Sequence, residues 1–285
     1  MKIALLTCQS LPNLSESDQL LIPVLAQKNI IATAVIWDDK SINWSDFDYL
    51  IFRNTWDYYE KQLEFDNWLF EIEKLGIKTL NSIEIINQNK HKFYLKALEK
   101  KGIKIIPTVF IDKTDNLNLR NIIPKNWSKA VIKPAYSGGS YQTKLFDISE
   151  IENINNQYSS IAAEKELLLQ EFIPEIKTLG ETSFIFFNEK FSHAVNKKPV
   201  NDDFRIQEQF GGIYTLIYVN QEIINKAQKI VNTFSEKLLY ARVDGIIIDN
   251  ELHLMEIECL EPDLYFNLAE NSINRFAETI IEMIR

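Results

Sequence analysis

Short apolar runs alternate with amphipathic stretches along the first 80 residues, and this alternation constrains the fold most strongly. The apolar runs have the length of buried strands, and the stretches between them have the apolar spacing of helices. The expected strands cover 2–7, 31–37, 49–53 and 77–80, and the expected helices cover 16–28 and 62–75. Gly76 follows the second helix, at a position where glycine commonly ends a helix. Strands that alternate with helices form βαβ units, so we expect an N-terminal α/β domain over residues 1–86.

The rest of the chain has a different pattern, because most of its expected strands come in neighbouring pairs. These pairs are 130–133 with 142–146, 181–187 with 191–196, and 242–248 with 252–258, and a further strand covers 166–172. The expected helices cover 92–101, 149–157, 221–237 and 264–284. Hairpins mixed with helices are typical of α+β lobes. We therefore expect a central lobe over 87–174 and a C-terminal lobe over 175–285.

Composition limits the classes of function. Apolar residues make up 46% and charged residues 25%, as in ordinary globular proteins. The two cysteines, Cys8 and Cys259, are too few for a disulfide framework and are expected to be reduced. A net charge of −9 without a basic stripe argues against nucleic-acid binding. The sequence has neither a signal peptide nor an apolar run long enough to span a bilayer, so we expect a cytoplasmic protein without membrane contact.

Two acidic residues end the last expected strand, in the segment Met255-Glu256-Ile257-Glu258. Residues two apart on a strand face the same side, so Glu256 and Glu258 present two carboxylates to one site. Asp244 faces that pair if the hairpin has a simple register. Clustered carboxylates repel each other unless a cation neutralises them, and hard oxygen ligands suit magnesium. A solvent-exposed acidic strand face is the alternative interpretation.

A lysine ends an apolar strand just before a glycine pair, in Ile132-Lys133-Pro134 followed by Ser137-Gly138-Gly139. Glycine is rare here, with eight residues in the chain, so the pair carries positional information. A cation beside a loop rich in backbone N–H groups is suited to holding phosphate. The chain contains no G-x-x-x-x-G-K-[ST] segment, which excludes the P-loop as the phosphate-binding device. An ordinary hairpin with a surface lysine remains the alternative.

Together these segments resemble the ATP-grasp superfamily, and within it the subgroup that contains the prokaryotic glutathione synthetase-like proteins and the cyclo-ligase of the cycloserine pathway. The resemblance covers nearly the whole chain. It rests on the order and spacing of 53–58, 132–135 with the glycine loop, 180–183, 191–194, 203–207 and 242–265. It implies an ATP-grasp fold of α+β lobes behind an N-terminal Rossmann-like pre-ATP-grasp domain.

The resemblance also implies roles for individual residues. It assigns Lys92 and Lys133 to the ATP phosphates, with Lys90 as an alternative to Lys92, and it implies that the loop from Ser137 through Gly138 and Gly139 to Thr143 closes over them. The nucleoside would be read by Gln170, Glu171, Phe172 and Ile173 at the adenine and by Glu181 at the ribose. Asp244, Glu256 and Glu258 would bind two Mg²⁺ ions, with Mn²⁺ as a substitute. Arg242 would stabilise charge on the transferred phosphate.

The implied reaction is ATP-dependent activation of a carboxylate as an acyl phosphate, followed by attack of an amine and release of ADP and phosphate. Small carboxylate and amine substrates, such as amino acids or short peptides, are expected, and a homodimer is compatible with the resemblance. An ATP-grasp kinase or carboxylase and a non-catalytic nucleotide-binding module are the alternatives. In many ATP-grasp ligases an asparagine and a Pro-Gly stand where this chain has Glu258 and Glu261-Pro262-Asp263, which leaves the substrate open.

Four further charged residues are candidates for contact with substrate or phosphate. Lys197 and Arg205 are expected to bind anions at the reaction centre, and Arg205 has the planar fork that clamps a carboxylate in two places. Arg53 and Asp57 lie just after an expected strand, where α/β folds place ligand contacts. His193 is expected to be a hydrogen-bonded structural residue, because a lone histidine in a strand is seldom a catalytic base.

Overall fold

The N-terminal part is built on a four-stranded parallel sheet in the order β2-β1-β3-β4. The structure, a computed structural model, describes residues 1–199 and 211–285. The elements of this part are β1 (Lys2–Thr7), α1 (Glu16–Gln19), α2 (Leu21–Gln27), β2 (Ile31–Ile36), η1 (Trp44–Asp46), β3 (Tyr49–Asn54), α3 (Gln62–Leu75) and β4 (Lys78–Leu80). Gly76 ends α3 in the left-handed conformation, with φ of 70°, as expected for a C-cap. The expected α/β arrangement of this part is confirmed.

The helix expected over 16–28 is instead two short helices that meet at Leu20. Pro23 explains the break, because its ring has no N–H and collides with the carbonyl of residue 19 in a continuous helix. The break places Pro23 in the first turn of α2, where a backbone N–H has no helical partner in any case.

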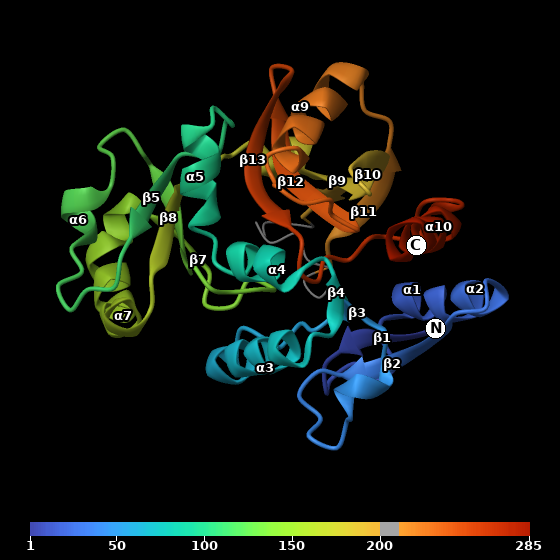
Figure 1. Cartoon of the computed structure of the whole chain (residues 1–285). Coiled ribbons are helices and arrows are strands. Elements are labelled where there is room, and N and C mark those ends of the chain that lie inside the picture. Colours follow the sequence, from blue (N-terminus) through green and yellow to red (C-terminus); the bar gives the residue numbers. More distant parts are fainter. Residues whose placement is uncertain (200–210) are drawn as a thin grey trace.

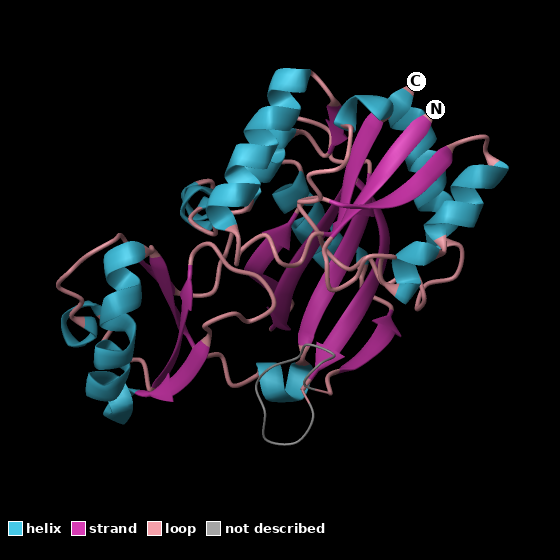
Figure 2. Ribbon diagram, turned by 90° about the horizontal axis from the view of Figure 1, so that it is seen from below, coloured by secondary structure: helices cyan, strands magenta, loops and turns pink. Residues whose placement is uncertain are grey.

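The middle of the chain forms a second four-stranded sheet, in the order β5-β8-β6-β7, with antiparallel neighbours. Its elements are β5 (Thr108–Ile111), α6 (Leu119–Ile122), β6 (Lys129–Pro134), β7 (Lys144–Asp147), η2 (Ile148–Glu150), α7 (Ile151–Glu164) and β8 (Leu167–Glu171). Helix α7 packs on one face of this sheet through Ile154, Tyr158 and Ala162. Strands β6 and β7 form the expected hairpin around the glycine pair, and this sheet with its helices stands apart from the rest of the molecule in Figure 2.

The C-terminal part is a five-stranded antiparallel sheet in the order β11-β10-β9-β12-β13. Its elements are β9 (Glu181–Phe187), β10 (Lys190–Lys198), β11 (Ile213–Ile217), α9 (Gln221–Val231), β12 (Tyr240–Ile248), β13 (Glu251–Glu258) and α10 (Ser272–Ile284), and α8 (Ile176–Leu179) precedes them. Asp249 and Asn250 turn the last hairpin, both with positive φ. The helix expected from residue 264 begins only at Ser272, because Tyr265 and Asn271 have positive φ of 52° and 57°, which an α-helix does not accommodate.

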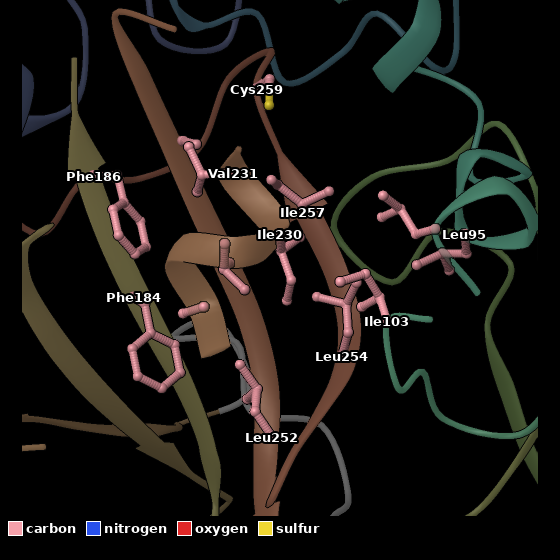
Figure 3. Close-up of a cluster of buried hydrophobic side chains, with 14 of the residues drawn as sticks. Leu95, Ile103, Phe184, Phe186, Ile230, Val231, Leu252, Leu254, Ile257 and Cys259 are labelled. Carbon is pink, nitrogen blue, oxygen red and sulfur yellow. The ribbon is translucent and has the colours of Figure 1, made fainter. Parts of the chain in front are cut away.

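Two segments pack across the expected lobe boundaries. Helix α4 (Ile83–Asn89), which periodicity did not predict, and α5 (Tyr94–Lys100) join the first sheet to the second. Leu95 and Ile103 pack against Leu254 and Ile257 of β13, as Figure 3 shows, although residues 87–107 were expected in the central lobe. Helix α10 packs on α2 in the N-terminal part (Figure 1). The boundaries at 86 and 174 therefore remain a prediction.

None of the helices described in residues 1–199 and 211–285 is long and apolar enough to cross a membrane.

Candidate active site

One face of the C-terminal sheet carries a row of charged side chains. Arg242 and Asp244 of β12 lie directly opposite Glu258 and Glu256 of β13. The expected simple register is wrong, because the pairing shifts by one residue between Asp244 and Gly245, and without this shift Asp244 would lie opposite Met255. On the other side of β12, Asp244 lies opposite Ser183. Strand β9 also brings Glu181 opposite Lys197 of β10. Residues directly opposite each other in an antiparallel sheet project from the same face, so all of these groups meet in one place.

The carboxylates of Asp244, Glu256 and Glu258 form the acidic centre of this row. One oxygen from each of them lies within 4.8 Å of the others. Carboxylate oxygens gathered at this spacing match the preference of Mg²⁺ and Mn²⁺ for hard oxygen ligands. The residues present therefore fit a divalent cation.

Basic side chains neutralise these acids in the structure. The Nη2 atom of Arg242 lies 2.9 Å from Asp244 and 2.8 Å from Glu258. Lys197 Nζ lies 2.5 Å from Glu181 and 3.4 Å from Asp244. The Ser183 hydroxyl also donates to Asp244, which is fully buried. Each buried acid named here thus has a cation beside it, as buried charges require.

The pKa values of the three carboxylates diverge because their surroundings differ. Burial raises the pKa of Glu258 well above its usual range, and Arg242 only partly opposes this. Burial acts in the same direction on Glu256, but Lys92, Lys133 and Arg242 outweigh it and lower the pKa of Glu256. Arg242 and Lys197 likewise lower the pKa of Asp244 against the effect of burial. A cation bound beside Glu258 would therefore favour its ionised form.

Lys92 connects the acidic centre to the glycine loop. Its Nζ atom lies 3.2 Å from Glu256 and donates to the Ser137 carbonyl at 2.9 Å. A cavity lies beside these acids, and Lys92 lines it. Lys90 pairs instead with Asp66 of α3 and does not line this cavity. Lys133 also lines the cavity, and burial lowers its pKa. Lys92 and Lys133 thus converge on the space above the acids.

The glycine loop closes one side of the cavity through a close approach to the N-terminal part. A Cβ atom on Gly138 would lie 2.8 Å from the Tyr59 ring, so only glycine fits this contact without a shift. Gly139 has a φ of 53°, in the region that favours glycine. Both residues line the cavity together with Ser137. The rarity of glycine was therefore an informative signal at this position.

The cavity has a volume of about 590 Å³, and residues of the N-terminal, middle and C-terminal parts line it. One part of its wall is apolar, where Ile106, Ile176, Ile246 and Met255 pack together with Phe172 and Ile173. The segment Gln170, Glu171, Phe172 and Ile173, at the end of β8, lines the same cavity. Glu181 also lines it, and burial raises the pKa of Glu181 to about 7 despite the nearby Lys197. The volume and the mixed lining suit a ligand with an apolar end and an anionic end.

Two of the residues expected to contact substrate have structural partners. Arg53 is fully buried and bonds to Asp18 at 2.8 Å and to the Pro262 carbonyl at 2.9 Å. Asp57 accepts hydrogen bonds from Trp37 Nε1 and from Lys61, both at 2.7 Å. A contact with substrate would require each side chain to give up these bonds. Arg205 lies outside the described residues.

Sequence reasoning missed several residues that line the cavity. Tyr59 of the N-terminal part, Glu261 and Tyr265 of the segment after β13, and Asn89 and Tyr94 of the α4–α5 region all contribute to its wall. Burial raises the pKa of Glu261 to about 8. Glu261 belongs to the segment Glu261-Pro262-Asp263, where the sequence differs from many ATP-grasp ligases, and this difference could have pointed to Glu261. No spacing or composition signal singled out Asn89 or Tyr94.

His193 lies away from this chemistry, on β10. Its Nε2 atom lies 3.0 Å from the Leu264 carbonyl and its Nδ1 atom lies 2.9 Å from the Ser192 hydroxyl. Burial lowers the pKa of His193 to about 4, and the bond to Leu264 only partly opposes this. These partners are consistent with the structural role expected for it.

The lowered pKa of His193 predicts that acid destabilises the fold. The unfolded chain binds the proton from about pH 6.5 downward, while the folded chain resists it until about pH 4. The contribution of His193 is therefore fully present above pH 6.5 and is lost as the pH falls toward 4. From pH 7 to pH 5 we expect the loss of this contribution to lower the free energy of unfolding by about 2 kcal/mol. Urea unfolding of the wild type and of His193→Gln at both pH values should show a smaller pH dependence in the variant; equal dependence would contradict the prediction.

The sheets, the glycine loop and the acid-rich hairpin define an ATP-grasp enzyme. The chain belongs to the family described as "Prokaryotic glutathione synthetase, ATP-grasp domain", whose model matches residues 92–271. The N-terminal residues 3–81 match a second model, described as "D-cycloserine synthetase DcsG, N-terminal domain". The recognition of an ATP-grasp ligase from sequence is confirmed, and members of this class use ATP and divalent metal ions.

Individual relatives agree with this family. The chain is 23% identical over 273 residues to the cycloserine biosynthesis protein DcsG of Streptomyces lavendulae, with 90% of each chain covered. The crystal structure of D-cycloserine synthetase DcsG is similar over 100% of both chains, with a TM-score of 0.89 and 22% identity. A D-alanine–D-alanine ligase from Bacillus anthracis in complex with ATP matches with a TM-score of 0.69 and 17% identity, over 99% of this chain and 96% of that one. The structural matches support the ATP-grasp fold.

Proposed function

We propose that this ligase activates a substrate carboxylate as an acyl phosphate, which an amine then attacks to form an amide or a ring. The observation that carries the proposal is the separation of charge along the cavity. Asp244, Glu256 and Glu258 gather with Arg242 and the two lysines at one end. The apolar wall beside residues 170–173 is suited to an adenine base. A nucleotide placed along this axis presents its terminal phosphate to the charged end.

We assign the nucleotide to the residues of the cavity in that orientation. Gln170, Glu171, Phe172 and Ile173 read the adenine, and Glu181 holds the ribose. Lys92, Lys133 and the loop with Ser137, Gly138 and Gly139 hold the phosphates. Asp244, Glu256 and Glu258 would hold two Mg²⁺ ions, or Mn²⁺ in their place, which would supply positive charge beside the phosphates.

The protein contributes position and charge to the transfer. A carboxylate oxygen of the substrate attacks the γ-phosphorus, the bond to the bridging oxygen breaks, and ADP leaves. Arg242 lies between Asp244 and Glu258, so its guanidinium stabilises the negative charge that develops on the transferred phosphoryl group. The amine nitrogen then attacks the acyl carbon, phosphate leaves and the nitrogen loses a proton. Lys197 and Arg205 are proposed to bind the anionic groups during these steps.

The substrate class that we propose is an amino acid or a short peptide. The support comes from two similar proteins, the cycloserine biosynthesis protein DcsG and a D-alanine–D-alanine ligase. With a volume of about 590 Å³, the cavity has space beside the nucleotide for a compact second molecule and not for a large one. Substrate contacts from Arg53 and Asp57, a homodimer and a cytoplasmic location remain predictions.

The nucleotide product tests the mechanism. We expect incubation with ATP, Mg²⁺ and the correct carboxylate and amine to yield ADP and inorganic phosphate, because the cations cluster at one end of the cavity. The protein should be screened against amino acids and dipeptides, singly and in pairs, with ADP followed by a coupled assay and products identified by mass spectrometry. A single compound that supports turnover indicates ring closure or hydrolysis, which the product mass distinguishes. AMP and pyrophosphate as the sole nucleotide products would refute the acyl-phosphate mechanism.

A further inference from the structure

The strand that carries Glu256 and Glu258 lies at the edge of its sheet. Strand β13 pairs with β12 on one side only, so every second residue turns its backbone N–H and C=O away from the sheet. Such groups cost free energy when they are buried without a partner. An edge strand held from one side is also free to twist or shift. This is a demanding place for metal ligands, which must keep a fixed geometry.

Residues that precede the central sheet complete this open edge. At the start of the acidic segment the backbone of Leu254 exchanges hydrogen bonds with Lys104 and Ile106, at 2.8 and 2.9 Å. Further along, the Tyr94 hydroxyl accepts from the Ile257 N–H at 3.0 Å and donates to the Ile257 carbonyl at 2.9 Å. One hydroxyl thus satisfies both outward groups of one residue.

The side chain of Asn89 also bonds to backbone groups along this edge of β13. Its side-chain amide donates to the Ile257 carbonyl at 2.7 Å and its amide oxygen accepts from the Cys259 N–H at 2.7 Å. Asn89 is buried, at 8% exposure. The amide therefore acts as a missing strand partner on the two residues that flank Glu258. Ile257 also separates Glu256 from Glu258, so the bonds of Asn89 and Tyr94 hold the backbone between both acids.

The same short segment contacts the glycine loop. Lys92 lies between Asn89 and Tyr94 in the chain, and its backbone N–H donates to the Ala135 carbonyl at 2.8 Å. Its side chain reaches Ser137 and Glu256. Residues 89–94 thus set the spacing between the acid-bearing strand and the loop proposed for the phosphates.

We propose that Asn89 and Tyr94 are positioning residues for the metal site, because their side chains complete the open edge of β13 on both sides of Glu258. Neither side chain needs to touch a metal or a substrate to act in this way. The bonds keep Glu256 and Glu258 in register with Asp244 and Arg242 before any ligand arrives. This inference rests on the proposed role of the three acids as metal ligands.

The test compares metal binding in Tyr94→Phe, Asn89→Leu and a matched control. Tyr94→Phe keeps the ring and removes only the hydroxyl, and Asn89→Leu keeps the volume and removes both amide bonds. Asn155→Leu serves as the control, because the Asn155 side chain also accepts from a backbone N–H, that of Leu119 at 2.8 Å, but Asn155 belongs to α7 and does not line the cavity. Binding of Mn²⁺ to the whole protein with saturating ADP can be measured by electron paramagnetic resonance.

We expect the dissociation constant for Mn²⁺ to rise about 10- to 100-fold in Tyr94→Phe and in Asn89→Leu, the size of effect seen when groups that orient metal ligands are removed. Asn155→Leu should lower the melting temperature without changing Mn²⁺ affinity. Turnover of the two test variants should recover as the metal concentration is raised, which a general loss of folded protein would not allow.

The outcomes separate this inference from the proposed function. If folded Tyr94→Phe and Asn89→Leu bind Mn²⁺ as tightly as the wild type does, the positioning role is overturned and the proposed function is unaffected. Wild-type protein that fails to bind Mn²⁺ with ADP overturns the metal site, and the positioning role with it. If Asn89→Leu does not fold, Tyr94→Phe decides, because it removes a single oxygen atom.

Discussion

Replacing Glu256 with glutamine is expected to lower turnover by about a hundred- to a thousandfold, while the fold remains intact. Glu256 lies opposite Asp244 at the centre of the acidic cluster and 3.2 Å from Lys92. Glutamine keeps the shape and removes the negative charge, so the site loses cation affinity and the preorganised charge pattern that stabilises phosphoryl transfer. The measurement is ADP release at saturating ATP and Mg²⁺, with circular dichroism as the check on folding.

Glu251→Gln provides the matched control for that experiment. It makes the same chemical change on the same strand, but Glu251 pairs with Lys226 at 2.6 Å and does not line the cavity. Turnover of this variant should stay close to the wild-type value. Wild-type turnover in Glu256→Gln would contradict the assignment of Glu256 as a metal ligand.

Replacing Asp18 with asparagine is expected to destabilise the protein by about 3 to 5 kcal/mol, since it leaves the charge of Arg53 buried without a counter-ion. Arg53 and Asp18 have side-chain exposures of 0% and 1% and lie 2.8 Å apart. Asp18 also accepts a hydrogen bond from the Asn54 amide, and an asparagine amide placed there would oppose that donor. Arg53 bonds in turn to the Pro262 carbonyl, so the pair ties the N-terminal sheet to the segment after β13.

The melting temperature of Asp18→Asn should fall by on the order of 10 °C. Glu152→Gln is the appropriate comparison, because it breaks another arginine–carboxylate pair, with Arg120 at 2.7 Å, whose side chains are 68% and 69% exposed. An exposed pair of this kind contributes within about 1 kcal/mol, so the melting temperature should hardly change. Equal shifts in the two variants would mean that burial does not set the strength of the Arg53–Asp18 pair.

Local sequence signals were sufficient where the structure depends on neighbouring residues. The helix Gln62–Leu75 has the predicted bounds, because Phe65, Trp68, Leu69 and Ile72 form its buried stripe and Gly76 ends it. The turn at Asp249 and Asn250 pairs Ile248 with Glu251, but a register shift between Asp244 and Gly245, which no local signal predicted, brings Asp244 opposite Glu256. Helix α4 was missed, although its N-cap Ser82 bonds to the Ile85 N–H, because the helix is short and its periodicity is weak.

By itself, the sequence determined that Glu256 and Glu258 share one strand face and that Lys133 stands before a glycine loop, and its resemblance to known ligases indicated the ATP-grasp class. The first two features follow from short-range rules: a strand repeats every two residues, and glycine permits close approach. Only the tertiary structure decided that Arg53 is buried against Asp18 and that Asn89 completes the edge of β13. The partners of Asn89 lie 168 and 170 residues further along the chain. A side chain's use at that distance depends on how whole sheets pack, which neither periodicity nor propensity encodes.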